Sequence, residues 1–383
     1  MSVSKHLRLL FFVSDLDYFI SHRLSLALGA IHKGYDVWVM CPYVDSLREL
    51  PEGIRVFFLK NFRKSRLSPW SVWKEFLEIS KALKSLAPDI LHNVGMKPIF
   101  LGSYGARSSC GVVNDFSGLG YTFTASLKGY ALKKYVLQCI FYSFLPIVLR
   151  KKNCVLLCQN KQDESILRKS TKNLNVPISL IPGSGIDMSH FSILPMQKGP
   201  PWRLLFAGRL LKEKGLEELV EACRLLNNSD LEILVCGEVD LENPSSCTSK
   251  HIEAWKNLGN IQWLGFQKDL RWVYEKVHGA VLPSYREGLP RSLLEACAWG
   301  RPIITTQVPG CQDVVIDGVT GYLVQARDAL ALSIAIDAWI KDDQKEQKGK
   351  AGHDHVLKHF SKEKIHPKIF DVYCKILKKE CQS

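Results

Sequence analysis

The sequence predicts an α/β protein made of two domains, each built on a parallel β-sheet. Its 383 residues are the length of two ordinary domains. In both halves, short apolar runs typical of strands alternate with amphipathic segments typical of helices, which favours parallel sheets covered by helices. Residues 182–187 are rich in turn formers and residues 195–201 are typical of a linker, so the two halves are expected to be separate domains.

In the first half, each expected strand is followed by a helix or a turn. A helix over residues 19–33 has Ile20, Leu24 and Leu28 on one face, and Gly34 is suited to its end. A second helix begins near Trp70 and stops at Leu86, because Pro88 cannot continue it. Strands are expected over residues 7–13, 36–40, 54–59, 89–94 and 178–181.

The second half repeats this alternation. Strands are expected over residues 202–206, 231–236, 261–264, 279–283 and 302–305. Helices are expected over residues 215–227 and 269–276, from about Pro290, and from Ser361 to the basic C-terminal end. Ligands of parallel sheets bind beyond the carboxyl ends of the strands, so the loops that follow these strands are the places to look for a site.

Charge and cysteine content restrict the class of protein. Residues 1–190 carry 25 Lys and Arg against 13 Asp and Glu, and the remainder is nearly neutral. A basic first half suits an anionic partner or, alternatively, solubility. The 12 cysteines show no zinc-ligand spacing, which predicts a reduced cytosolic protein without a structural metal. The apolar run 135–149 is too short to span a membrane, so we expect a buried or membrane-surface helix there.

Two glutamates mark the most informative segment. Glu287 follows the strand 279–283, and Glu295 lies about two turns into the helix that begins near Pro290. The backbone N–H groups of Gly288 and Leu289 lie at that helix N-terminus, where they can bind an anion. Carboxylates for hydroxyl groups and N–H donors for a phosphate suit a sugar nucleotide. The spacing alone fits a solvated helix with two surface glutamates equally well.

A second segment carries cations at a strand-to-helix turn. Gly208 and Arg209 follow the strand 202–206, and Lys214 comes just before the next helix. An arginine can form paired hydrogen bonds with phosphate oxygens, and a lysine adds a compact positive charge. This arrangement suits a diphosphate, although a solvated basic turn would look the same.

Together, the two segments resemble the C-terminal half of glycosyltransferase family 4, the retaining enzymes of GT-B fold. The resemblance implies two Rossmann-like domains with parallel sheets facing across a cleft, and a C-terminal helix that crosses back. It places an acceptor domain at residues 1–190, a linker at 191–202, a donor domain at 203–360 and the crossing helix at 361–383. By the same resemblance, Arg209, Lys214 and Glu287 are catalytic, and the donor contacts Glu295, Gly288, Leu289, Pro290, Gly208, Gly265 and Phe266.

The first half resembles the members of this family that build surface polysaccharide by extending lipid-diphosphate-linked sugars. The acceptor-side candidates follow its strands and are His22, Arg23, Lys97, Asp115, Ser117 and Gly118. The family often has a histidine where this chain has Ser117, so the means of holding the donor sugar differs here. Asp115 or Ser117 itself could partly replace it. His22, Arg23 and Lys97 could equally be ordinary surface residues.

The resemblance implies that a sugar is transferred with retention from a nucleotide-sugar to a polyprenyl-diphosphate-linked saccharide. In this subgroup the donor is expected to be UDP-linked. Neither a metal nor a cofactor is expected. The basic segment 63–66 and lysines 128, 133 and 134 predict contact with anionic lipid, and hence a cytoplasmic protein at the inner face of the membrane. A solvated basic face is the alternative for these lysines.

Other classes of protein stay open at this stage. A GT-B epimerase or phosphorylase would share the donor domain, but nothing in the sequence marks a hydrolytic or phosphate-accepting site. A nucleic-acid-binding protein would explain the basic first half, yet no helix-turn-helix, zinc or RNP-like signature is present. We therefore expect no nucleic acid among the partners, and a saturable nucleotide-sugar site would separate the transferase from the binding protein.

Overall fold

The computed structural model describes residues 6–43, 50–63, 68–123, 131–149, 153–240, 245–256 and 259–378. The chain divides into two compact units, residues 1–185 with 362–383 (unit 1) and residues 186–361 (unit 2). The predicted α/β class with two parallel sheets is confirmed. Among the described residues, no helix is both long enough and apolar enough to cross a membrane.

Unit 1 contains a seven-stranded sheet in its described part, with strand order β3-β2-β1-β4-β5-β6-β7 and parallel pairing throughout. The strands are β1 Arg8–Val13, β2 Asp36–Pro42, β3 Ile54–Leu59, β4 Ile90–Val94, β5 Gly111–Phe116, β6 Cys154–Cys158 and β7 Ile178–Leu180. The helices are α1 Leu16–His22, α2 Leu24–His32, α3 Pro69–Leu86, α4 Met96–Gly105, α5 Gly120–Phe123, α6 Ala131–Val148, α7 Lys161–Ser170 and α15 Lys362–Leu377. Strands β1, β2, β4, β5 and β6 are mostly buried, which agrees with their apolar sequences, whereas the edge strands β3 and β7 are mostly half-buried.

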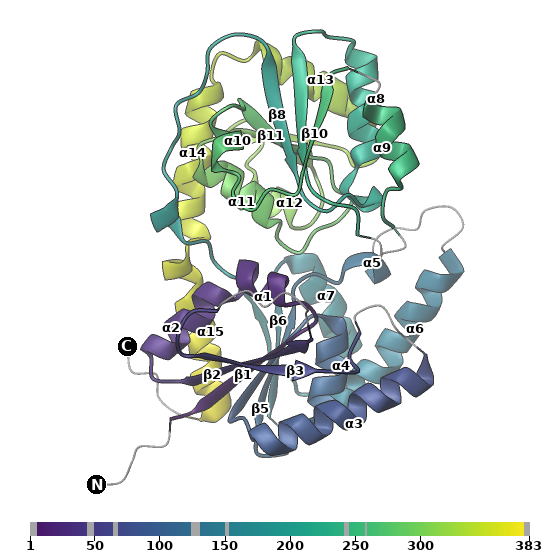
Figure 1. Cartoon of the computed structure of the whole chain (residues 1–383), viewed down its shortest axis with the longest axis vertical. Helices are drawn as coiled ribbons and strands as arrows, with labels where there is room; N and C mark the ends of the chain where they lie inside the picture. The colour runs from purple at the N-terminus through teal and green to yellow at the C-terminus, as the bar shows by residue number, and fades with distance from the viewer. Residues whose placement is uncertain are drawn as a thin grey trace. The chain divides into compact units, whose positions relative to one another are not determined.

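Helices cover both faces of this sheet (Figure 1). One apolar core is formed with α3, α4, α6 and α7, and the other with α1, α2 and α15. The last helix, α15, therefore packs in unit 1 although the chain reaches it only after unit 2. Its buried side chains Ile365, Ile369 and Tyr373 recur at helical spacing and face the sheet.

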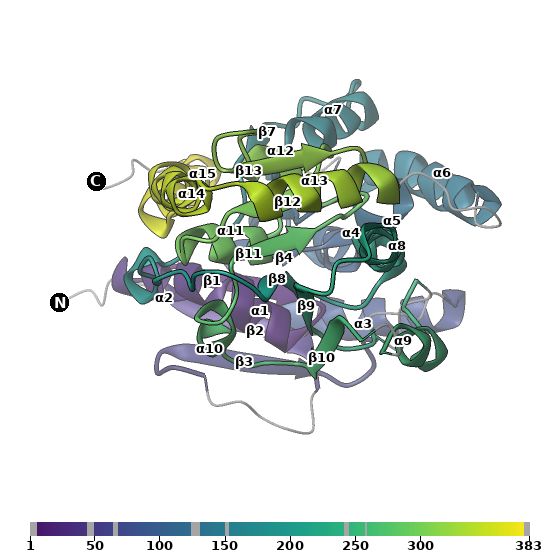
Figure 2. The same ribbon diagram turned by 90° about the horizontal axis from the view of Figure 1, so that it is seen from above.

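Unit 2 contains a six-stranded parallel sheet in its described part, with order β10-β9-β8-β11-β12-β13. The strands are β8 Trp202–Ala207, β9 Leu231–Cys236, β10 Ile261–Gly265, β11 Gly279–Leu282, β12 Ile303–Thr306 and β13 Gly321–Val324. The helices are η1 Met188–His190, η2 Lys212–Lys214, α8 Leu216–Leu226, α9 Ser249–Lys256, α10 Arg271–Tyr274, α11 Arg291–Ala298, α12 Cys311–Val314, α13 Ala329–Lys341 and α14 Lys345–His359. Helix α8 packs against α13, and α11 against α14, around the strands (Figure 2).

Three local predictions differ from the structure. The helix expected over residues 19–33 is broken at Arg23 into α1 and α2, and Asp15 caps α1 by accepting from the N–H groups of Asp17 and Tyr18. Lys97 was expected on a loop but lies in the first turn of α4. Cys374 is disulfide-bonded, so the expectation of a fully reduced chain is wrong there. Ten other cysteines are free, and all of these except Cys139 are buried.

A buried histidine in unit 2 predicts a loss of stability in mild acid. His278 Nδ1 accepts a hydrogen bond from the Arg203 N–H at 3.0 Å. Burial, with the nearby cations Arg203, Arg301 and Lys345, lowers the His278 pKa from 6.5 to about 4. Between these two pKa values the unfolded chain binds a proton that the folded chain does not. The stability that the fold gains from holding His278 neutral is therefore complete above about pH 6.5, and it is lost as the pH falls toward 4.

We expect the free energy of unfolding to fall as the pH is lowered from 7 to 5. His278→Gln should reduce the slope of this free energy against pH by an amount that corresponds to at most about one bound proton. Urea titrations at several pH values measure this slope. The exposed His32→Gln is the control. An unchanged slope in His278→Gln would contradict the assignment.

Candidate functional site

In unit 2, the two motifs predicted from sequence meet at the carboxyl ends of neighbouring strands. Lys214 Nζ, at the end of η2, lies 2.5 Å from Glu287 Oε1, on the loop after β11. The Ser284 hydroxyl donates to the same carboxylate oxygen at 2.6 Å. Both charged side chains are mostly buried. The structure thus joins a cation and a carboxylate that are 73 residues apart in sequence.

The contact between Lys214 and Glu287 is possible because two backbone segments approach closely at Gly215. Gly215 has a φ of +73°, and a Cβ atom there would lie 2.1 Å from the Pro283 carbonyl oxygen. The backbone N–H of Tyr285 donates to the Glu213 carbonyl at 2.8 Å. The turn that carries Lys214 is therefore pressed onto the loop after β11, and only glycine fits at this approach.

The helix α11 follows directly, and its N-terminal end is the predicted anion site. Pro290 is its N-cap and offers no side-chain hydrogen bond to the first turn. The loop residues Gly288 and Leu289 precede it, and a Cβ at Gly310 would lie 2.6 Å from the Gly288 carbonyl oxygen. Glu295, about one turn after Arg291, pairs through its Oε1 with Arg291 Nε at 2.7 Å. N–H groups and the helix dipole at this end favour a phosphate.

Arg209 follows β8 on the same edge of the sheet. Its Nη1 lies 3.1 Å from Asp240 Oδ2, and about half of the side chain is exposed. Next to it, Gly208 has open space where a side chain would extend. A Cβ at Gly237, after β9, would instead lie 1.9 Å from the Gly208 carbonyl oxygen. The turn therefore leaves room for a ligand over Gly208, with a guanidinium that can move from Asp240 onto an anion.

The loop after β10 completes this edge of unit 2. Gly265 has a φ of +67°, which favours glycine, and Phe266 beyond it is 55% exposed. Since all six strands are parallel, these residues follow the same edge of the sheet as Gly208 and Glu287. An exposed ring at this edge can stack on a planar base.

In unit 1, two predicted site residues form a buried ion pair. Arg23 Nη2 lies 2.6 Å from Asp115 Oδ2, and the Arg23 side chain is only 1% exposed. His92 Nε2 is 3.4 Å from the same oxygen, while its Nδ1 is 2.6 Å from the Tyr373 hydroxyl. Burial alone would raise the Asp115 pKa, but Arg23 and His92 hold it below its ordinary value. Burial lowers the His92 pKa.

His22, next to Arg23, is partly exposed at the end of α1. Its ring stacks on Tyr18 with centroids 4.2 Å apart, and its Nδ1 is 2.7 Å from the Ser21 hydroxyl. Arg23 Nη1 donates to the His22 carbonyl at 3.1 Å. The buried pair therefore fixes the turn that presents the His22 ring.

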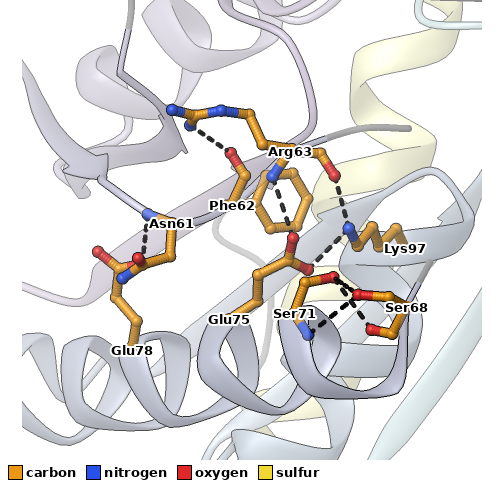
Figure 3. A network of polar contacts seen from close by, with 8 residues as sticks. All are labelled: Asn61, Phe62, Arg63, Ser68, Ser71, Glu75, Glu78 and Lys97. Atoms are coloured by element: carbon orange, nitrogen blue, oxygen red, sulfur yellow. Dashed lines mark hydrogen bonds and ion pairs between the residues drawn. The ribbon is translucent and has the colours of Figure 1, made fainter. Parts of the chain in front are cut away.

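Lys97 belongs to a polar network that holds the loop after β3 (Figure 3). Lys97 Nζ lies 2.7 Å from Glu75 Oε2 and donates to the Arg63 carbonyl at 2.5 Å. Glu75 accepts from the Arg63 N–H at 3.2 Å, and Glu78 accepts from the N–H groups of Lys60 and Asn61. A role for Lys97 in binding an acceptor would compete with these contacts.

Ser117 and Gly118 follow β5 and are partly exposed. Gly118 has a φ of +115°, and the next N–H, that of Leu119, donates to Asp163 Oδ2 at 3.3 Å. Lysines 133 and 134 lie on α6, but their side chains, the segment 64–67 and Lys128 are outside the described residues. Among the described residues, no group of three His, Cys, Asp or Glu could hold a metal ion.

The sequence did not single out several partners that the structure reveals. Ser284 and Asp240 contact predicted catalytic residues, and Glu75 and His92 contact predicted acceptor-side residues. Tyr373 in turn contacts His92. Only Ser284 carried a local signal, since it lies three residues before Glu287 and directly after the strand.

Two protein-family models match the chain. "Glycosyl transferase 4-like" matches residues 8–169, and "Glycosyl transferases group 1" matches residues 195–355. The N,N'-diacetylbacillosaminyl-diphospho-undecaprenol alpha-1,3-N-acetylgalactosaminyltransferase of Campylobacter jejuni is 25% identical over 352 residues, covering 87% of this chain and 89% of the relative. The UDP-Gal:alpha-D-GlcNAc-diphosphoundecaprenol alpha-1,3-galactosyltransferase of Escherichia coli is 26% identical over 314 residues, 77% of each chain.

Solved structures show the same architecture. A sucrose-phosphate synthase from Thermosynechococcus elongatus has a TM-score of 0.80 at 20% identity, covering 97% of this chain and 100% of the other. This likeness confirms the predicted GT-B fold.

Proposed function

Because the chain belongs to the glycosyltransferases that combine a family 4-like domain with a group 1 domain, we propose that it transfers a sugar from a UDP-sugar to a lipid-linked saccharide. The observation that carries this proposal is the contact of Glu287 with both Lys214 and Ser284, next to the N-terminus of α11. The cation and the N–H groups suit the diphosphate of a nucleotide-sugar, and the carboxylate suits its sugar.

The proposed roles follow the placement of each group in unit 2. Lys214, Arg209 and the first turn of α11 stabilise the diphosphate as it leaves, which is preorganised electrostatic catalysis. Glu287 orients the sugar hydroxyls, and Glu295 holds the ribose of the nucleotide. Gly208 leaves space for the diphosphate, and the loop at Gly265 and Phe266 contacts the base.

We propose that the reaction retains the anomeric configuration and uses no metal. The acceptor oxygen bonds to C1 on the face from which the diphosphate departs, and the bond from C1 to the diphosphate oxygen breaks. The hydroxyl proton passes to the departing diphosphate oxygen, so no enzyme-bound sugar is formed. Glu287 then has a different role from the nucleophile of retaining glycoside hydrolysis.

We propose a polyprenyl-diphosphate-linked saccharide of cell-envelope polysaccharide as the acceptor, bound by unit 1. The names of the C. jejuni and E. coli relatives both include a saccharide linked to diphosphoundecaprenol, and both specify an alpha-1,3 linkage. His22, Gly118 and Ser117 are the exposed candidates for acceptor contact, and Arg23 with Asp115 would position them. The enzyme would work at the cytoplasmic face of the membrane, in peripheral contact with anionic lipid.

The test is donor-dependent release of nucleotide. Purified enzyme is incubated with UDP-GlcNAc, UDP-GalNAc, UDP-Gal, UDP-Glc or GDP-Man and a membrane extract that contains lipid-linked saccharides. We expect release with one donor, dependent on the extract. No release with any donor, together with no shift of the melting temperature by UDP or GDP, would contradict the proposal.

Glu295→Ala is expected to raise the donor KM by about tenfold or more, since a hydrogen bond to a charged group contributes about 1.5–3 kcal/mol. The same assay measures this change over a range of donor concentrations. Glu221→Ala on α8, a half-exposed glutamate that also pairs with an arginine on its own helix, is the matched control. A donor KM equal to that of the control would exclude Glu295 from the donor site.

A further inference from the structure

Helix α6 in unit 1 has an apolar outer face. Its side chains Phe141 and Leu145 belong to the core at helical spacing, and Val148 is buried as well. The opposite face is nevertheless apolar as well, and residues 135–149 contain no charged side chain. The large apolar residues exposed there are Leu132, Tyr135, Val136, Ile140, Tyr142, Phe144 and Ile147, and the smaller Cys139 and Ser143 are exposed among them. A helix that is apolar all round is normally covered on every side.

The neighbouring helices extend this apolar surface. Helix α4 packs against both α3 and α6, on one side of the sheet (Figures 1 and 2). Trp70 and Trp73 on α3 are 66% and 52% exposed, and their rings stack with centroids 5.5 Å apart. Tyr104 on α4 is 59% exposed. Tryptophan and tyrosine are enriched where proteins meet the headgroup region of a bilayer.

The charge of the sequence around α6 indicates which kind of partner covers its apolar face. Residues 116–162 carry seven Lys and Arg and no Asp or Glu. A second copy of this chain, related by two-fold symmetry, would bring the same cations toward one another. An anionic lipid surface would instead attract them while it takes up the apolar side chains. No described helix can span the bilayer, so the contact is with its surface.

We propose that the outer faces of α6 and α3 form the surface by which this protein docks on an anionic membrane. The proposal deepens the proposed function and rests on it, because docking there would hold unit 1 at the leaflet that carries a lipid-linked acceptor. Apolar side chains of α6 enter the headgroup boundary and the tryptophans of α3 lie at its level, while the positive charge of the sequence 116–162 attracts the protein to anionic headgroups.

The test measures co-sedimentation of the full chain with vesicles of phosphatidylcholine containing about 30% phosphatidylglycerol. Ile140→Glu/Phe144→Glu and Trp70→Ser/Trp73→Ser alter exposed residues of the surface. Leu330→Glu/Ile334→Glu, an equally spaced and exposed pair on α13 of unit 2, is the matched control. We expect each surface variant to bind at least about tenfold more weakly, and the control to bind as the wild type does.

Binding by both surface variants at the wild-type level would overturn the proposal. So would a wild-type protein that does not bind anionic vesicles, or a wild-type dimer in gel filtration that Ile140→Glu/Phe144→Glu converts to a monomer. Urea unfolding followed by circular dichroism confirms that each variant is folded. UDP binding, followed by calorimetry, separates the two proposals, since a protein that binds vesicles but neither UDP nor a UDP-sugar would retain the docking surface and contradict the transferase.

Discussion

Lys214→Ala is expected to lower the rate of sugar transfer at saturating donor by about 10²–10³-fold, as loss of one preorganised oxyanion donor does. Lys214 Nζ is held 2.5 Å from Glu287 Oε1 and is mostly buried, so its charge acts at short range in a poorly hydrated place. Without it, the departing diphosphate loses a cation and Glu287 loses its partner. Initial rates of nucleotide release measure the effect.

Lys212→Ala is the matched control, because Lys212 lies in the same short helix but its Nζ is 3.9 Å from Glu217 and more exposed. Its rate should stay close to that of the wild type, since exposed pairs contribute about 0–1 kcal/mol. Glu287→Gln should add little to the loss in Lys214→Ala, because residues that act as one unit are not additive. Equal losses in Lys212→Ala and Lys214→Ala would refute a specific role for Lys214.

The strands, turns and helix starts that carry the donor-side candidates could be predicted well, because their signals are local. Each motif there consists of an apolar strand, a turn with glycine and the start of a helix, and these features depend on residues close in sequence. The strand over residues 231–236 has the predicted bounds. The sequence could not predict the distance between the Lys214 motif and the Glu287 motif. This distance depends on strands β8 and β11 being neighbours in the sheet.

The acceptor side was harder to predict because long-range contacts decide its structure. The break at Arg23 occurs where the side chain turns to Asp115, 92 residues away, and no local signal interrupts the helical pattern. Lys97 lies on α4 although Pro98 follows it, because a proline in the first turn lacks only an N–H that has no partner within the helix. The contact of His92 with Tyr373 joins residues 281 apart.

Asp115→Ala is expected to destabilise unit 1 by about 3–5 kcal/mol, the cost of leaving a buried charge without its partner. Arg23 is 1% exposed and cannot reach water unless the turn between α1 and α2 opens. Urea or thermal unfolding, followed by circular dichroism, measures the loss. The double variant Arg23→Met/Asp115→Leu should lose less than the sum of its single variants, because no unpaired charge remains.

The pair of Arg168 with Glu164 on α7 provides a control of matched distance. It too is joined at 2.6 Å, but the Arg168 side chain is 61% exposed. Glu164→Ala should therefore cost about 0–1 kcal/mol in the same measurement. Equal losses in Asp115→Ala and Glu164→Ala would mean that burial adds nothing to the Arg23 pair. Arg23 would then be free to turn outward, and direct contact with the acceptor would replace positioning as its role.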